Sequence, residues 1–205
     1  MTAPKTLTCG GKTLDLTRPQ VMGILNVTPD SFSDGGRYNL LEAAIDHAHT
    51  IVEEGATLID IGGESTRPGA TPVTSQEEMD RVLPVLDALR TRFDVVYSID
   101  TSNPALMVEA ANAGAGMLND VRAFLQPGAE AAALECVRDH QVALCLMHMQ
   151  GDPTTMQSAP AYVNVVGEVA EFLATRARML TALGVPSSQL VIDPGFGFGK
   201  SLGHN

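Results

Sequence analysis

The chain has 205 residues, of which 44% are hydrophobic and 18% are charged. This balance is ordinary for a soluble globular domain and excludes a disordered tail, a coiled coil and a collagen-like fibre. The 24 acidic and 13 basic residues give a net charge of −11, which repels a phosphate backbone and argues against nucleic-acid binding.

Cysteine usage and hydropathy bear on the location of the protein. The three cysteines, Cys9, Cys136 and Cys145, are scattered and form no CxxC pair, as is usual for proteins of the reducing cytosol. No stretch approaches the roughly 20 apolar residues that a membrane span needs, and the first residues carry no apolar run typical of a signal peptide. We therefore expect a cytoplasmic protein with no membrane partner.

Short apolar runs alternate with longer helical patterns along the chain. The strands are apolar nearly throughout, as expected of strands buried on both faces of a parallel sheet. In chain order the sequence predicts strand 21–27, helix 40–54, strand 57–62, a helix opening at 75, strand 95–100, a helix over 103–114, strand 116–120, helix 128–138, strand 142–148, helix 161–183 and strand 190–195.

Local signals refine the helix ends. Ser75 and Glu78 spell a capping box, and Pro84 is expected to kink the helix that they open. Asn103 and Pro104 place a cap before a proline at the first helical position. The last helix shows a predicted buried face most clearly, in Val163, Val166, Val169, Leu173, Leu180 and Leu183.

A polar residue ends each predicted strand: Asn26, Asp60, Asp100, Asn119 with Asp120, His148 and Asp193. In a doubly wound open sheet only the strands at the switch point meet a ligand, whereas in a (β/α)8 barrel all strand ends line one mouth. The pattern therefore favours an α/β fold of the (β/α)8 TIM-barrel type over the open sheet. Because a whole barrel takes about 250 residues, we expect an incomplete barrel of about six βα units, in a single domain over residues 1–205.

The first segment that carries chemistry runs from Gly23 to Gly36. Its strand ends at Asn26 and continues into a loop of small, polar and glycine residues that can close over a ligand. An Asn carbonyl oxygen is a neutral hard ligand that suits Mg²⁺ when phosphate and water complete the coordination sphere. The alternative is a surface turn that uses Asn and Asp for local hydrogen bonds, and the segment by itself does not decide between the two.

The second segment runs from Gly55 to Gly69 and places Thr66 and Arg67 after a strand. An Arg at this point offers a rigid fork for a carboxylate or a phosphate, with Pro68 shaping the loop. The alternative is a surface Arg in a salt bridge. Because an acidic chain places Arg here rather than another Asp, we favour the binding interpretation.

Together these two segments resemble the two signature stretches of the dihydropteroate synthases, enzymes of folate biosynthesis. The resemblance covers the chain from about Leu14 to its end, through SIDTS (98–102), LNDVR (118–122), LMHMQG (146–151) and DPGFGFGK (193–200). It implies a (β/α)8 barrel and a transferase that joins 6-hydroxymethyl-7,8-dihydropterin pyrophosphate to p-aminobenzoate. The products would be 7,8-dihydropteroate and pyrophosphate, and sulfonamides would compete for the p-aminobenzoate site.

The resemblance also implies roles for individual residues. Asp193 and Asn119 would hold the amide–guanidine edge of the pterin, and Asp100 would oppose positive charge that develops on the ring. Asp100 and Arg67 are therefore the expected catalytic residues, and Asn26 would bind the Mg²⁺ that serves the pyrophosphate. The full expected pterin set is Thr66, Asp100, Asn119, Met147 and Asp193, and the set around p-aminobenzoate is Phe32, Arg67, Pro68 and Phe196.

The family pattern has two further basic clusters. One is a Ser-Arg-Lys stretch on the seventh strand, whose Lys reaches both substrates, and the other is an Arg-x-His pair on the eighth strand that binds pyrophosphate. The chain reaches Asn205 about a dozen residues past its sixth predicted strand, so we expect strands seven and eight and both clusters to be absent. We therefore expect the pterin pocket to be largely retained and the synthase activity to be weak or lost. The family is typically homodimeric, through C-terminal helices that we also expect to be absent.

Two alternative functions share part of this pattern. One is a non-catalytic pterin-binding remnant, and the other is a methyltransferase domain that binds methyltetrahydrofolate, although TPDSFSDGG and ESTRPGA are not expected there. The run from Gly195 to Ser201 resembles a phosphate loop, but Pro194 stands where that motif requires Gly. His148 is interpreted as a hydrogen-bonding residue rather than a metal ligand, because no second ligand lies at a recognisable spacing.

Overall fold

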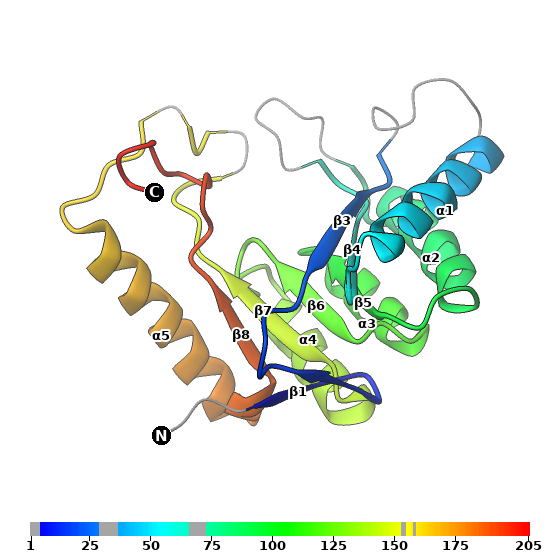
Figure 1. Cartoon of the computed structure of the whole chain (residues 1–205). Helices are drawn as coiled ribbons and strands as arrows, with labels where there is room; N and C mark the ends of the chain where they lie inside the picture. Colours follow the sequence, from blue (N-terminus) through cyan, green and yellow to red (C-terminus); the bar gives the residue numbers. More distant parts are fainter. Residues whose placement is uncertain (1–4, 29–36, 66–72, 153–154, 158) are drawn as a thin grey trace.

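The computed structural model describes residues 5–28, 37–65, 73–152, 155–157 and 159–205. A hairpin of two short strands comes first, and strands then alternate with helices (Figure 1). In chain order the elements are β1 (Thr6–Cys9), β2 (Lys12–Asp15), β3 (Met22–Asn26), α1 (Arg37–Glu53), β4 (Leu58–Gly62), α2 (Ser75–Arg90), β5 (Val96–Asp100), α3 (Pro104–Asn112), β6 (Met117–Asp120), α4 (Ala129–His140), β7 (Ala143–Met147), α5 (Val165–Leu183), a 3-10 turn (Ser187–Gln189) and β8 (Leu190–Asp193).

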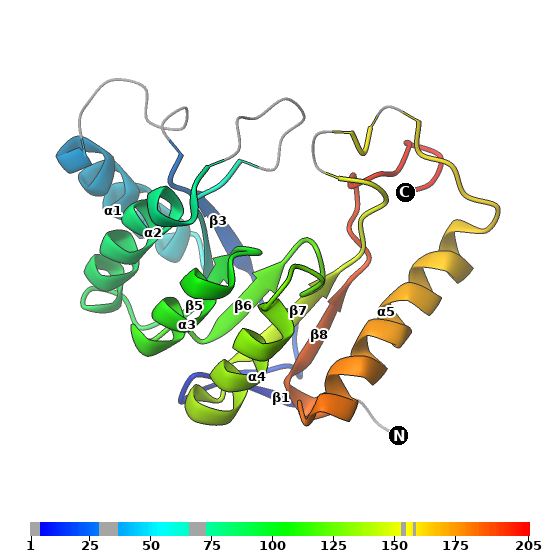
Figure 2. The ribbon, with the colours of Figure 1, turned by 180° about the vertical axis from the view of Figure 1, so that it is seen from behind.

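The main sheet of the described chain has six parallel strands in the order β3-β4-β5-β6-β7-β8. This spatial order follows the chain order and lacks the reversal that defines a doubly wound sheet. The sheet curves, and helices α1 to α5 cover its outer face (Figures 1 and 2). The predicted fold, a TIM-barrel type with about six βα units, is confirmed.

Alternation along each strand divides the core into two layers. Every second residue of a strand faces outward and packs beneath the helices. Examples are Ile59, Ile99, Leu118 and Leu144. The next residue faces the barrel interior, where polar groups gather at the carboxyl ends of the strands. The outer layer is therefore the structural core, and the inner layer is free to carry a site.

The β1–β2 hairpin closes the floor of the barrel. Leu7, Cys9 and Leu14 form a second apolar cluster with inward residues at the start of the parallel strands. The hairpin lies so close to β6 that a Cβ added at Gly116 would stand 2.8 Å from the carbonyl oxygen of Cys9. This hairpin was not predicted, although a Gly-Gly pair between two strand-like runs is a hairpin signal.

All six predicted strands are confirmed, but some helix ends differ from the prediction. The capping box of α2 is formed by Thr74 and Glu77 rather than by Ser75 and Glu78, and α2 continues through Pro84 to Arg90.

Helix α5 begins at Val165 rather than at 161. Asn164 caps it by accepting a hydrogen bond from the Gly167 backbone. Glu168 accepts hydrogen bonds from the backbone of Val163 and Asn164. Val163 and Val166, predicted on the buried face, are therefore exposed.

Within the described ranges, every helix is too short or too polar to cross a bilayer.

Candidate active site

The carboxyl ends of the parallel strands bring together residues from distant parts of the sequence. Residues paired across neighbouring strands point to the same face of the sheet. The strand pairing places four residues side by side, Asn26, Gly62, Asp100 and Asn119. Further along the sheet it places Met147 beside Asp193. The described residues predicted to contact the pterin or the metal therefore share the mouth of the barrel.

Asp60, one step inside this mouth, forms a polar pair with Asn119 at the mouth itself. Asp60 is 5% exposed, and Asn119 Nδ2 donates a hydrogen bond of 3.0 Å to Asp60 Oδ2. The second carboxylate oxygen of Asp60 and the amide oxygen of Asn119 are buried without a hydrogen-bond partner among the described residues. Buried acceptors are normally satisfied, so these two oxygen atoms mark a place in the interior where N–H or O–H donors are missing.

The interior of the mouth is strongly acidic. Burial raises the pKa of Asp60, although the neighbouring side chains of Ser98 and Asn119 oppose the shift. Burial also raises the pKa of Asp100 well above its usual range, and the carboxylates of Asp60, Asp120 and other acids add to this. Such a site favours a ligand rich in N–H donors or one that carries positive charge.

Cys145 shows how closely these acids converge. Its side chain faces the interior, next to Asn119 in register. Burial raises the pKa of its thiol to about 12, and the carboxylates of Asp193, Asp60 and Asp100 add to the effect. Carboxylates of three strands thus act on one thiol at the centre of the mouth.

The oxygen atoms of Asn26 and Asp100 flank a small space above Gly62. A Cβ added at Gly62 would lie 3.3 Å from Asn26 Oδ1 and 3.6 Å from Asp100 Oδ2, so both oxygen atoms lie close to this glycine. An amide oxygen and a carboxylate oxygen suit a hard cation that shares its sphere with phosphate and water. No group of three or more His, Cys, Asp or Glu side chains suited to a metal occurs among the described residues.

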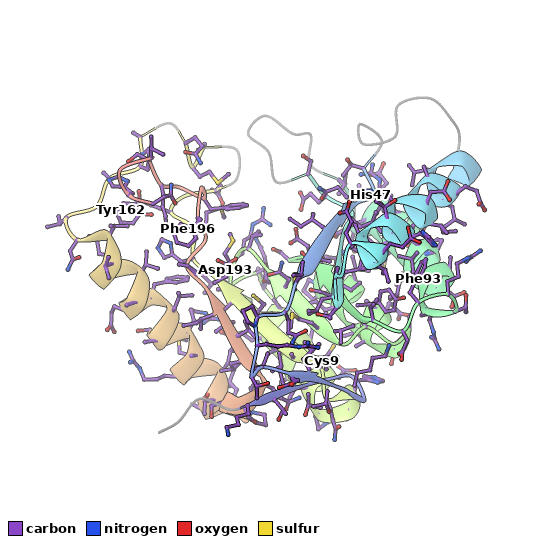
Figure 3. All side chains as sticks on the ribbon, viewed as in Figure 1. Cys9, His47, Phe93, Tyr162, Asp193 and Phe196 are labelled. Carbon is purple, nitrogen blue, oxygen red and sulfur yellow. The ribbon has the colours of Figure 1, made fainter. Side chains whose placement is uncertain are left out.

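The segment after β8 supplies the other wall of the mouth. Asp193 Oδ1 accepts a hydrogen bond of 2.7 Å from the backbone of Gly195, which fixes the carboxylate. Phe196 is 68% exposed at the end of β8, next to Asp193 (Figure 3). Met147 is buried beneath Gly195, where an added Cβ would lie 3.1 Å from Met147 Cγ.

Two strand-end residues point away from the mouth. Asp120 accepts hydrogen bonds from Ser102 Oγ and from the backbone of Arg122 and Phe124, so it orders the loop between β6 and α4. The ring of His148 packs on Phe172 of α5 with a centroid distance of 5.0 Å. Successive side chains of a strand point to opposite faces of the sheet. Asp120 follows the inward-facing Asn119 and His148 follows the inward-facing Met147, so both point outward.

Asp60, which the sequence analysis did not include among the site residues, lies in the interior beside Asn119. Asp60 lies two residues before Gly62 in the same strand, and residues two apart share a face of the sheet. This spacing could have placed Asp60 on the inward face. Four predicted site residues, Phe32, Thr66, Arg67 and Pro68, lie outside the described residues.

Comparisons with known proteins agree on one family. Residues 22–205 match the family model described as pterin binding enzyme. The dihydropteroate synthase of Escherichia coli K12 is 50% identical over 195 residues, which are 95% of this chain and 68% of that protein.

Solved structures show the same likeness. A Yersinia pestis dihydropteroate synthase in a sulfonamide drug complex has a TM-score of 0.89 at 54% identity, covering 98% of this chain and 71% of that one. A Xanthomonas albilineans dihydropteroate synthase with 4-aminobenzoic acid has a TM-score of 0.89 at 51% identity, covering 98% and 70%.

Proposed function

The chain belongs to the pterin-binding enzymes, in the dihydropteroate synthase family of folate-biosynthesis transferases, and from this premise we propose how its own residues serve that reaction. The barrel mouth binds 6-hydroxymethyl-7,8-dihydropterin pyrophosphate beside p-aminobenzoate. The observation that supports this most directly is the Asp60–Asn119 pair, whose two spare buried oxygen atoms face the same interior as Asp100 and Asp193.

The pterin edge is complementary to these acceptors. Asp193 presents a carboxylate held by Gly195, and a carboxylate that faces two adjacent N–H donors makes a strong bidentate contact. Asn119 and Asp60 accept further N–H groups of the ring, and Met147 packs against its face. A flat heterocycle with N–H donors along one edge fits this arrangement better than an anionic ligand does.

Asp100 assists the bond-breaking step electrostatically. When the C–O bond to pyrophosphate breaks, its electron pair leaves with the pyrophosphate and positive charge remains on the pterin methylene and ring. The nearby Asp100 carboxylate opposes that charge. The nitrogen of p-aminobenzoate then forms the C–N bond and loses a proton, and the mouth must exclude water that would otherwise capture the cation.

We propose that Mg²⁺ binds beside Gly62. Asn26 and Asp100 would hold Mg²⁺ there, and the bound ion would neutralise charge on the pyrophosphate. The support is the pair of oxygen atoms that border this space and the preference of Mg²⁺ for oxygen ligands.

The p-aminobenzoate site rests on residues that the structure describes only in part. Exposed Phe196 is placed to contact an aromatic ring. Phe32, Thr66, Arg67 and Pro68 stay predictions, with Arg67 expected to stabilise the leaving group or the carboxylate.

We further propose that residues 1–205 by themselves support only weak synthase activity. The family's basic clusters of the seventh and eighth strands are not found at corresponding places among them. The one Arg-x-His spelling, Arg138 to His140, lies in the last turn of α4. Arg138 there pairs with Asp139 at 2.7 Å, at the helix end remote from the barrel mouth.

Two measurements test these proposals on the 205-residue chain. Isothermal titration with 6-hydroxymethyl-7,8-dihydropterin should show binding, and a coupled assay should show little pyrophosphate release. A version extended by two further βα units from a family member should release pyrophosphate at least about tenfold faster. Absence of pterin binding would contradict the pocket assignment, and turnover by the short chain within tenfold of the long one would contradict weak activity.

Location and assembly are also proposals. The cysteines Cys9, Cys136 and Cys145 are free and buried, which supports a reducing cytoplasm. The family homodimer stays a prediction for this chain. The methyltransferase alternative gains no support from the relatives described above.

A further inference from the structure

Lys200 is an unusual lysine because its ammonium group is enclosed by the protein. The residue is 6% exposed. Its Nζ atom lies 2.9 Å from the Gly195 carbonyl oxygen, 3.1 Å from that of Phe198 and 3.2 Å from that of His148. A fourth contact, at 3.0 Å, reaches the Nδ1 atom of the His148 ring. Because an ammonium has three N–H donors, these four acceptors leave it no donor for a ligand.

These contacts join the segment after β8 to the end of β7. The two segments lie against each other with no room for side chains: a Cβ at Gly195 would stand 2.0 Å from the His148 carbonyl oxygen, and one at Gly199 2.5 Å from that of Gln150. Gly195 and Gly199 both have positive φ, of 68° and 60°. Lys200 therefore neutralises a cluster of carbonyl oxygens that this close approach creates.

The same contacts lead directly to the pterin-facing residues. Lys200 holds the carbonyl oxygen of Gly195, and the backbone N–H of Gly195 holds the Asp193 carboxylate. Lys200 also holds the carbonyl oxygen of His148, while the backbone N–H of His148 binds the carbonyl oxygen of Asp193 at 3.0 Å. Met147 immediately precedes His148, so Lys200 fixes the backbone on both sides of the Met147–Asp193 pair.

We propose that Lys200 is a positioning residue, which holds Asp193 and Met147 in their pterin-binding arrangement without touching either substrate. This inference rests on the proposed function of the barrel mouth. The competing role for a lysine near this mouth is to bind the pyrophosphate, in place of the family's basic clusters. Its enclosure and its four acceptors oppose that role.

The test compares two ligands that differ only in the pyrophosphate. Lys200→Met keeps most of the apolar stem and removes the ammonium. Its affinities for 6-hydroxymethyl-7,8-dihydropterin and for the pyrophosphate ester are measured by isothermal titration. A positioning role predicts an equal loss for both ligands, of about tenfold or more, because one misplaced charge-assisted contact is worth that much.

Lys12→Met is the matched control. Lys12 also ties the backbone with its ammonium, at 2.6 Å to Asp94 and 2.7 Å to the Val95 carbonyl oxygen, but at the floor of the barrel. It should leave both affinities unchanged. Circular dichroism checks folding, and if Lys200→Met does not fold, Lys200→Gln takes its place with the same expected equal loss.

The outcomes are distinct. A loss confined to the pyrophosphate ester would show direct contact and overturn the positioning role, and so would unchanged affinity for both ligands. An equal loss in Lys12→Met would show a general effect of stability and would also overturn it. A wild-type chain that binds neither ligand would instead refute the proposed function.

Discussion

Asp193→Asn is the substitution that most directly tests the pterin-binding geometry. The wild-type carboxylate accepts the Gly195 N–H through Oδ1 at 2.7 Å and keeps acceptor capacity for the ligand. An Asn side chain of nearly the same shape has only one acceptor oxygen. If that oxygen keeps the Gly195 contact, the amide NH₂ faces the N–H groups of the pterin; if it turns to the pterin, the loop loses its own contact.

The expected magnitude follows from the loss of one charge-assisted hydrogen bond. Such a bond is worth about 1.5–3 kcal/mol, which corresponds to a rise in Kd of about 10- to 150-fold. The fold should survive, because the variant still has one acceptor for Gly195. The thermal midpoint is therefore expected to move by only a few degrees, as for a change of less than about 1 kcal/mol.

Isothermal titration with 6-hydroxymethyl-7,8-dihydropterin at neutral pH measures this effect. Asp46→Asn is the matched control, because it makes the same charge change on an exposed position in the middle of α1. A Kd of Asp193→Asn within twofold of wild type would refute the reasoning. An equal rise in Asp46→Asn would attribute the effect to net charge instead.

Asp100→Asn should weaken pterin binding and yet stabilise the free protein at neutral pH. Burial raises the folded-state pKa of Asp100. Its contribution to stability is therefore present at acid pH and is lost as the pH rises from about 4 through the raised pKa. Urea unfolding should show a flatter dependence of stability on pH for the variant than for the wild type, and identical dependences would count against this reasoning. Arg176→Met should destabilise by roughly 3 kcal/mol, because the buried guanidinium donates to the carbonyl oxygens of Ala123 and Phe124 at 3.0 and 3.3 Å; a loss under about 1 kcal/mol in chemical denaturation would contradict that estimate. Leu7→Ala should cost about 2–5 kcal/mol through the barrel floor, measured by the same method, and pterin affinity at a temperature where the variant is folded should not change.

The sequence predicted the fold because hydrophobic periodicity survives without tertiary information. Six apolar runs with polar ends predicted both the strands and the shared mouth, and Asn26, Asp100 and Asn119 lie in adjacent register there. The start of α5 was predicted wrongly because Val163 and Val166 continue the apolar pattern, while Asn164 and Glu168 end it by local hydrogen bonding.

The site was less predictable than the fold because its chemistry depends on side-chain partners. Asn119 was predicted to hold the pterin edge, and in the structure its amide also donates to Asp60, a pairing across β4 and β6 that no local pattern encodes. His148 and Lys200 both lie near strand ends in the sequence, but their mutual contact depends on the folded arrangement of β7 and the segment after β8.

The β1–β2 hairpin is joined to segments that lie far along the chain. Gly10 donates its backbone N–H to the carbonyl oxygen of Gln141 at 3.1 Å, and β1 also contacts the turn at Ser187–Gln189. Each of these contacts closes a loop of more than about a hundred residues, and contacts of such large sequence separation form slowly. The floor of the barrel is therefore expected to be completed late in refolding, after the local contacts of the βα units.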